Sequence, residues 1–160
     1  MSKTDITIRP IETADAAVIN RIMRGLGWFT WPEPSAESEA RIAAQIERYF
    51  ESGSDNRVTL MAVTPDGSAV GFVCVNWLDT VTATEGYISH LFVDEAYRGQ
   101  GIGQRLLSAI NEQAQARGCF RVFLYARHHR EVYQREFYPK QGWQAQDDAT
   151  LFMQFMQADE

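Results

Sequence analysis

Short stretches of alternating or continuous apolar residues recur along the chain and predict the strands of a β-sheet. They are residues 6–10, 58–63, 69–78, 87–93 and 120–125, with residues 142–143 and 150–156 as two closing strands. The run Val70–Val75 is almost entirely apolar, which is typical of a strand covered on both faces. Pro65-Asp66-Gly67 is a turn sequence and predicts a hairpin between the second and third stretches. The first stretch ends at a proline, which favours an edge strand.

Four other segments carry apolar residues at helical spacing or are bounded by helix signals. They begin near Thr13, Ser35, Ile102 and Arg130. Ser35 can cap the second of these helices, whose apolar residues at positions 42, 46, 49 and 50 share one side. Gly118 is expected to end the third helix and Pro139 the fourth.

The strand at residues 87–93 leads into a glycine-rich turn and then into the helix that begins at Ile102. The turn reads Arg98-Gly99-Gln100-Gly101-Ile102-Gly103-Gln104, with glycine at three alternate positions. Glycine lets the backbone turn sharply and leaves no Cβ over its amide groups. Unpaired N–H groups and the helix dipole favour an anion there, and Arg98 adds a positive charge. A plain strand-to-helix connection would explain a single glycine pair, whereas the full pattern favours phosphate binding.

Two familiar glycine motifs for phosphate binding do not fit this turn. A nucleotide P-loop requires a lysine after its glycines, and none follows here. A dinucleotide-binding fingerprint requires glycine where this chain has Gln104. The turn instead resembles the acyl-coenzyme A loop of the GNAT superfamily of N-acetyltransferases. That pattern has Arg or Gln, then Gly three positions later, then Gly or Ala two positions further, and Arg98, Gly101 and Gly103 match it.

The resemblance implies a fold and a reaction. The predicted order of elements is that of the GNAT fold, an α+β architecture with a mixed central β-sheet of about six to seven strands and about four helices. Residues 1–160 are expected to form one such domain. The implied enzyme is an acyltransferase that moves an acetyl group from acetyl-coenzyme A to an amine of a small molecule or peptide, by direct attack in a ternary complex. The competing hypothesis is a non-catalytic module that binds or senses acyl-coenzyme A.

Composition and charge narrow the choice of partners. The length of 160 residues suits one core, and the net charge of −6 argues against a general nucleic-acid binder. Residues 98–140 hold eight basic and three acidic side chains, whereas the rest of the chain holds seven and eighteen. Coenzyme A, a polyanion, would be attracted to the basic part and an amine to the acidic part. For most of these residues an ordinary solvated surface is the alternative interpretation.

Targeting and metal signals are absent from the sequence. No apolar run reaches the ~20 residues of a membrane helix, and the N-terminus does not resemble a signal sequence, so we expect a cytoplasmic protein without a membrane partner. Cys74 and Cys119 lack metal-ligand spacing, and no metal is expected. The oligomeric state stays open, with a homodimer as one option.

The resemblance also implies which residues bind acetyl-coenzyme A. In the family, the pantetheine arm lies along the strand before the loop, and the pyrophosphate lies on the loop amides. Carried over to this chain, the residues are Leu91, Phe92 and Val93 for the arm, and Arg98, Gly99, Gln100, Gly101, Ile102, Gly103 and Gln104 for the pyrophosphate. One strand amide would polarise the acetyl carbonyl.

Tyr138 is the implied proton donor to the leaving thiolate. The stretch from Phe137 to Trp143 resembles the second half of a family pattern that contains this tyrosine. The first half departs from the pattern, because Glu131 and Gln134 stand where asparagine and alanine occur. Without the coenzyme loop, Tyr138 would be interpreted as a packed core residue.

The base that accepts the amine proton is less well defined. Family members often place a carboxylate on the strand before the loop, and Glu85 is the only acid there, so Glu85 is preferred. Strand alternation puts Glu85 on one face with Tyr87 and Ser89, and His90 on the other. His90 and a water molecule remain alternatives.

Two other groups of residues have open interpretations. Trp28, Phe29 and Trp31 lie in a proline-bounded loop and either pack onto the core or shape the acceptor site. His128 and His129 are adjacent, which is not metal-ligand spacing, and are expected at the surface near the coenzyme.

Overall fold

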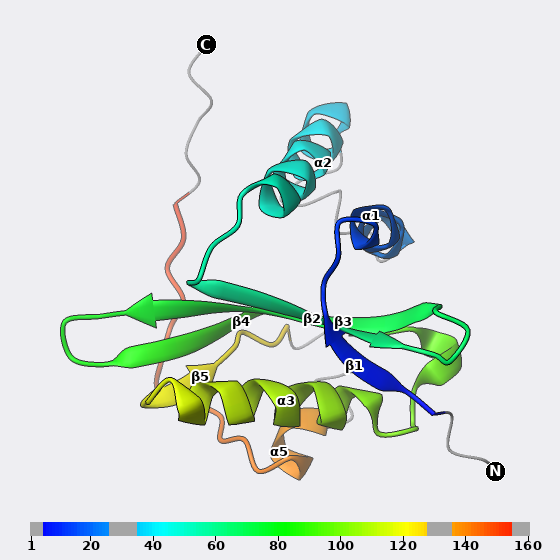
Figure 1. The fold of residues 1–160 in the computed structure, drawn as a ribbon. Helices are drawn as coiled ribbons and strands as arrows, with labels where there is room; N and C mark the ends of the chain where they lie inside the picture. The colour runs from blue at the N-terminus through cyan, green and yellow to red at the C-terminus, as the bar shows by residue number, and fades with distance from the viewer. Residues whose placement is uncertain (1–4, 26–34, 128–135, 155–160) are drawn as a thin grey trace. The chain divides into compact units, whose positions relative to one another are not determined.

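The computed structural model describes residues 5–25, 35–127 and 136–154 (Figure 1). The elements are β1 Thr7–Pro10, α1 Asp15–Gly25, α2 Ala36–Glu51, β2 Arg57–Val63, β3 Ala69–Asp79, β4 Thr84–Val93, the 3₁₀ helix η2 Glu95–Tyr97, α3 Ile102–Ala116, β5 Arg121–Phe123 and α5 Phe137–Lys140. The chain divides into two compact units, Met1–Leu124 and Tyr125–Glu160. The first unit holds the sheet with α1, α2 and α3, and the second holds α5. Among the described residues, no helix has both the length and the apolar character that crossing a bilayer requires.

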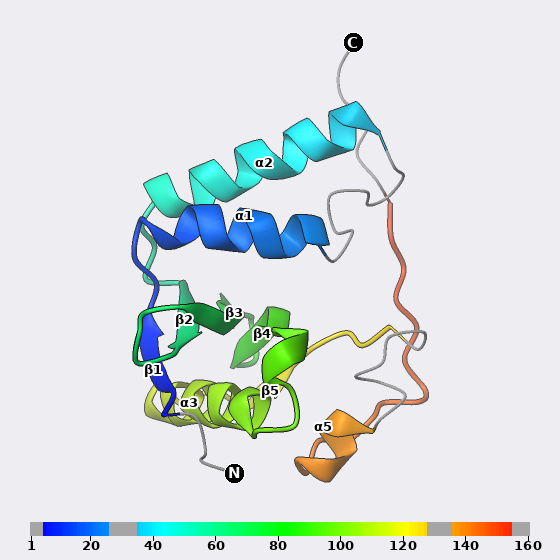
Figure 2. The same ribbon diagram turned by 90° about the vertical axis from the view of Figure 1, so that its right-hand side faces the viewer.

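The strands of the first unit form one mixed sheet in the order β1-β2-β3-β4-β5. Neighbouring strands are antiparallel except for β4 and β5, which run parallel. Figure 2 shows α1 and α2 on one face of this sheet and α3 on the other. The predicted α+β class is therefore confirmed, and β1 is an edge strand as predicted.

The sheet has five strands in the described part of the chain, rather than the six or seven that were expected. The difference arises at the two expected closing strands, because residues 142–143 and the described part of the second strand, residues 150–154, form no strand. The sequence suggested a strand here because of its apolar residues. Three of them, Leu151, Phe152 and Met153, are exposed, and the stretch pairs with none of the five described strands.

Local sequence signals set the ends of the helices. Ser35 caps α2, because its Oγ accepts the N–H of Ser38 at 3.0 Å while the Ser38 Oγ accepts the N–H of Ser35 at 3.2 Å. Gly118 follows α3 with a φ of 71°, a left-handed conformation that suits glycine. Pro139 was expected to end the fourth helix, but it lies inside α5. A proline is tolerated there because the N–H groups of a first helical turn have no partner within the helix. Residues 128–135 lie outside the described residues.

The core of the first unit has one layer on each face of the sheet. Met61 and Phe72 are paired across β2 and β3 and pack with Ile19 and Met23 of α1. On the opposite face, Gly71 of β3 lies under α3, and a Cβ on it would meet the Phe92 carbonyl oxygen at 2.7 Å. Leu106 and Ile110 of α3 are fully buried over that face. Burial on both faces explains the continuous apolar run of β3.

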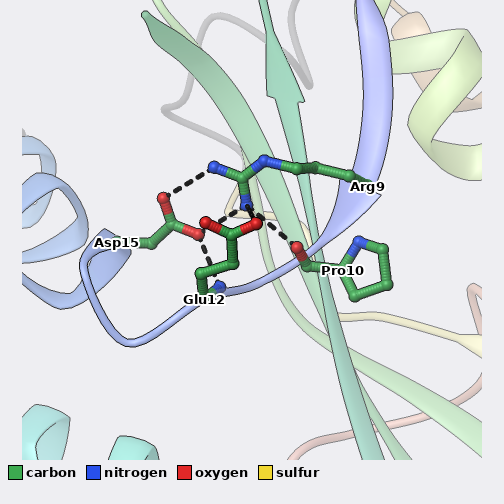
Figure 3. A network of polar contacts seen from close by, with 4 residues as sticks. All are labelled: Arg9, Pro10, Glu12 and Asp15. Carbon is green, nitrogen blue, oxygen red and sulfur yellow. Dashed lines mark hydrogen bonds and ion pairs between the residues drawn. The ribbon is translucent and has the colours of Figure 1, made fainter. Parts of the chain in front are cut away.

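An ion pair ties the edge strand β1 to the start of α1 (Figure 3). Arg9 Nη1 and Nη2 donate to the two carboxylate oxygens of Asp15 at 2.8 and 3.0 Å, and the Glu12 N–H donates to the same carboxylate at 2.7 Å. Burial of Asp15 opposes its ionisation, but the hydrogen bonds from Arg9 and Glu12 outweigh burial and hold the pKa of this carboxyl below its usual value.

Replacing Asp15 by Asn is expected to lower the free energy of unfolding by about 1–3 kcal/mol at pH 7, because the Arg9 guanidinium loses its bidentate partner. The contribution of Asp15 is present above the pKa of the unfolded carboxyl and is lost as the pH falls through the lower pKa of the folded state. Urea unfolding of the original protein and of Asp15→Asn, at pH 7 and at pH 3, measures this contribution to the free energy of unfolding.

The matched control is Glu12→Gln, because the Glu12 side chain is 68% exposed and lies 4.0 Å from Arg9. Its effect should stay within about 0.5 kcal/mol. Equal losses for the two variants would show that the buried pair does not hold β1 to α1.

Candidate functional site

The turn between β4 and α3 has the backbone conformation that its glycines permit. Gly99 and Gly101 have φ values of 75° and 79°, and Gly101 is the N-cap of α3. A Cβ at either position would meet nothing within 4 Å, so glycine is required there for its backbone conformation and not for space. Gly103 is the second residue of α3 and has ordinary helical geometry.

The N–H groups at the start of α3 are available to a ligand. Gly101 provides no side-chain cap, and within the described part of the chain the N–H groups of Gly99, Gly101, Ile102, Gly103 and Gln104 donate no hydrogen bond. The first intrahelical bond runs from the Arg105 N–H to the Gly101 carbonyl at 3.0 Å. Because the dipole of α3 adds positive potential at this end, the turn is a ready site for an anion.

The strand that leads into the turn has an open edge. β4 pairs with β5 only from Glu85 to Tyr87, whereas its pairing with β3 extends to Val93. Residues 88–93, which include the predicted Leu91, Phe92 and Val93, therefore have no described strand partner on the β5 side. Backbone groups along such an edge can pair with an extended ligand as another strand would.

Arg98 is held near the end of this edge. Its Nε donates to the Val93 carbonyl oxygen at 3.0 Å, so the guanidinium is anchored between β4 and the glycine turn. Arg98 directly precedes Gly99 in the chain, so its positive charge is carried by the residue with which the glycine turn begins.

A β-bulge in β4 changes which side chains face α1 and α2. Val75 of β3 pairs with Ile88, but the preceding Cys74 pairs with His90, so Ser89 is an extra residue in β4. The bulge reverses the alternation, and His90 joins Glu85 and Tyr87 on the same face of the sheet. The prediction that His90 points away from that face is wrong, because strand alternation assumes an unbroken register.

A cavity of about 420 Å³ lies on this face, between the sheet and helices α1 and α2. Apolar residues of α1, α2 and β3 form much of its wall, and its polar lining includes Arg57, Asn76, Ser89 and His90. The Nδ1 of His90 is 3.1 Å from the Ser89 Oγ, and burial lowers the pKa of the imidazole. His90 is consequently a neutral group at pH 7, able to accept a proton from a molecule in the cavity.

Glu85, the preferred base in the sequence, has a different environment. Its Oε1 accepts a hydrogen bond from Arg121 Nε at 2.6 Å, and the two residues face each other in β4 and β5. Its side chain is 14% exposed, but Glu85 does not line the cavity that contains His90. The structure thus separates the two candidate bases.

Tyr138 lies in α5 of the second unit. Its ring contacts those of Phe137 and Trp143, with centroids 5.2 and 5.9 Å away. Burial raises the pKa of Tyr138 to about 12, which keeps its hydroxyl protonated at neutral pH.

A hydrogen-bonded chain that joins two residues of the cavity wall, Tyr49 and Cys74, through the buried Thr59 was not predicted from the sequence. The hydroxyls of Tyr49 and Thr59 are hydrogen-bonded, and the Thr59 Oγ1 donates to the Cys74 Sγ at 3.2 Å. Burial raises the pKa of Cys74 to about 11, so its thiol is not a nucleophile at neutral pH. The sequence feature that could have indicated this chain is Thr59, a polar residue between Val58 and Leu60 in a buried strand.

Some of the residues interpreted from the sequence cannot be placed in the site. Trp28, Phe29, Trp31, His128 and His129 lie outside the described residues. Among the residues that the structure describes, no cluster of three His, Cys, Asp or Glu side chains could hold a metal ion.

The chain matches a known family model over most of its length. The model described as Acetyltransferase (GNAT) family matches residues 23–143, which include the glycine turn and Tyr138.

Individual relatives agree with this match. Glucosamine 6-phosphate N-acetyltransferase 1 of Oryza sativa subsp. japonica is 33% identical over 120 residues, covering 73% of this chain and 70% of the relative. Aminoglycoside N(6')-acetyltransferase type 1 of Klebsiella aerogenes is 28% identical over 123 residues, covering 70% and 72%. A solved structure of a predicted acetyltransferase with acetyl-CoA from Clostridium acetobutylicum has a TM-score of 0.71 at 18% identity, covering 92% of this chain and 96% of that one.

Proposed function

The chain belongs to the acetyltransferase (GNAT) family and is an acyltransferase, and we propose that it transfers the acetyl group of acetyl-coenzyme A directly to an amine in a ternary complex. The observation that carries this proposal lies at the end of an open strand edge, where the N–H groups of Gly99, Gly101, Ile102, Gly103 and Gln104 donate no hydrogen bond within the described residues. The family's donor, acetyl-coenzyme A, combines a pyrophosphate with an extended arm, and these two features match the turn and the edge.

The donor would bind along β4 and across the start of α3. The pantetheine arm pairs with the backbone of Leu91, Phe92 and Val93, and the pyrophosphate accepts hydrogen bonds from the amides between Gly99 and Gln104. Arg98, anchored on the Val93 carbonyl, adds its charge beside the pyrophosphate. One amide of β4 polarises the acetyl carbonyl and stabilises the oxyanion that develops on it.

The acceptor amine would attack from the cavity that contains His90. Its nitrogen forms a bond to the acetyl carbon, the thioester C–S bond breaks, and the electron pair leaves with the sulfur. His90 takes the proton that the amine loses, because His90 lines this cavity and its imidazole is neutral. The proton for the departing thiolate is assigned to Tyr138 because residues 137–143 resemble the family pattern that contains this tyrosine.

Release of free thiol from acetyl-coenzyme A in the presence of an amine panel tests the proposed function. We expect thiol release that depends on the amine and yields the acetylated amine in equal amount. Tight binding of acetyl-coenzyme A without turnover for small amines, amino acids, polyamines or peptide N-termini would instead support an acyl-coenzyme A sensor.

Replacing His90 by Gln should lower kcat by roughly 10²-fold or more, because the amine proton loses its acceptor. Glu85→Gln is the matched comparison, since it removes the other candidate base from the same face of β4, and its kcat should fall far less. Both are measured by thiol release at saturating acetyl-coenzyme A. A large loss for Glu85→Gln with normal kcat for His90→Gln would restore Glu85 as the base.

Tyr138→Phe should lower kcat by roughly tenfold while leaving the affinity for acetyl-coenzyme A unchanged, because only the proton for the thiolate is lost. Tyr125→Phe is the control, since Tyr125 is a 59% exposed tyrosine of the same unit. Full turnover of Tyr138→Phe would assign Tyr138 to packing alone.

A further inference from the structure

We propose that the acceptor is a small primary amine that carries an anionic group, a carboxylate or a phosphate, and that Arg57 binds this group in the cavity between the sheet and α2. The inference rests on the proposed function and names the class of acceptor for the same site. It starts from the charges of the cavity wall. Arg41 and Arg57 line the cavity, and no Asp or Glu does so among the described residues.

The position of Arg57 suits a ligand at one end of the cavity. Its guanidinium lies 3.9 Å from the centre of the Tyr49 ring, which also lines the cavity. Its hydrogen bonds within the described residues all come from Nη2, to the carbonyls of Tyr49 and Ser52 and to the Ser52 hydroxyl. These bonds fix the guanidinium plane and leave the Nε and Nη1 donors for an anion.

The end of the cavity where the amine would react lies two strands away from Arg57, on the same face of the sheet. Arg57 pairs with Asn76 of β3, and the next row of the same face holds Cys74 and His90. Two strand spacings of about 4.8 Å therefore separate the β2 backbone at Arg57 from the β4 backbone at the bulge. A small molecule can span this width with its anionic group on Arg57 and its amine at Ser89 and His90.

The same wall disfavours a cationic acceptor. An ammonium group in the cavity would be repelled by the Arg57 guanidinium, which donates to neutral carbonyl and hydroxyl oxygens, and would find no carboxylate in the lining among the described residues. Apolar walls from α1, α2 and β3 add a desolvation cost for an unpaired cation. The charge of the wall thus favours a neutral amine at the reacting end and an anion at the other end.

Matched pairs of acceptors test this assignment. Glucosamine 6-phosphate is compared with glucosamine, and phenylalanine with phenethylamine, because each pair differs chiefly in the anionic group. Calorimetry with coenzyme A present gives the affinity of each amine, and thiol release from acetyl-coenzyme A gives kcat and KM. For at least one pair, the anionic member should bind roughly tenfold more tightly and have a correspondingly lower KM. The pair that shows the preference distinguishes phosphate from carboxylate.

Arg57→Gln should remove this preference by raising the KM of the anionic member roughly tenfold, with little change for the neutral member. Activity with the neutral member shows that the variant is folded. Arg21→Gln is the control, because Arg21 is an exposed arginine of α1 that does not line the cavity, and it should keep the preference.

Equal affinity for both members of both pairs, or tighter binding of kanamycin, a polycation, would overturn the proposal. So would a preference for the anionic member that survives Arg57→Gln unchanged. Failure of the proposed function gives a different result, in which no amine releases thiol even though the binding preference is present.

Discussion

The left-handed backbone at Gly99 and Gly101 is the constraint on which the site depends. These two residues turn the chain from the end of β4 into α3, and at Gly101 the helix begins without a side-chain cap. A residue with a Cβ adopts such a φ only at a cost, and a capping side chain would occupy the N–H groups that start α3. The glycines therefore leave a helix N-terminus unsatisfied within the described fold, beside a strand edge that β5 does not cover.

A second constraint acts within β4 itself. The extra residue at Ser89 keeps Glu85 and Tyr87 on one face and brings His90 onto that same face, under α1 and α2. Without the bulge, His90 would face α3 and the cavity would lose the neutral imidazole in its wall. The bulge lies within β4, and the glycine turn follows β4 in the chain, so under the proposed function the donor and the acceptor meet where β4 diverges from β5.

Much of the fold follows from local sequence signals. The Ser35 cap, the helix from Ile102 to Gly118 and the two-faced burial of β3 were all predicted, because each depends on residues near one another in the sequence. The family resemblance, carried by the loop around Gly101, supplied the rest of the architecture.

The cavity was beyond what the sequence could show. Arg57, Tyr49, Cys74 and His90 come from four different elements and meet only through strand register and helix packing. The bulge at Ser89 cannot be recognised from the hydrophobic pattern of β4. One extra residue moves the side chains that follow it to the other face of the sheet, and the residue types of the strand do not show where this happens. The pairing of Glu85 with Arg121 likewise needed the parallel register of β4 and β5.

The most direct measurement of the central claim is the affinity of coenzyme A for Gly101→Asp and Gly101→Asn by calorimetry. Asp and Asn have nearly the same size and both tolerate a left-handed conformation, so the two variants differ chiefly by a negative charge beside the N–H groups of α3. The account predicts that Gly101→Asp loses at least about tenfold more affinity than Gly101→Asn. Equal and undiminished binding by both variants would contradict it.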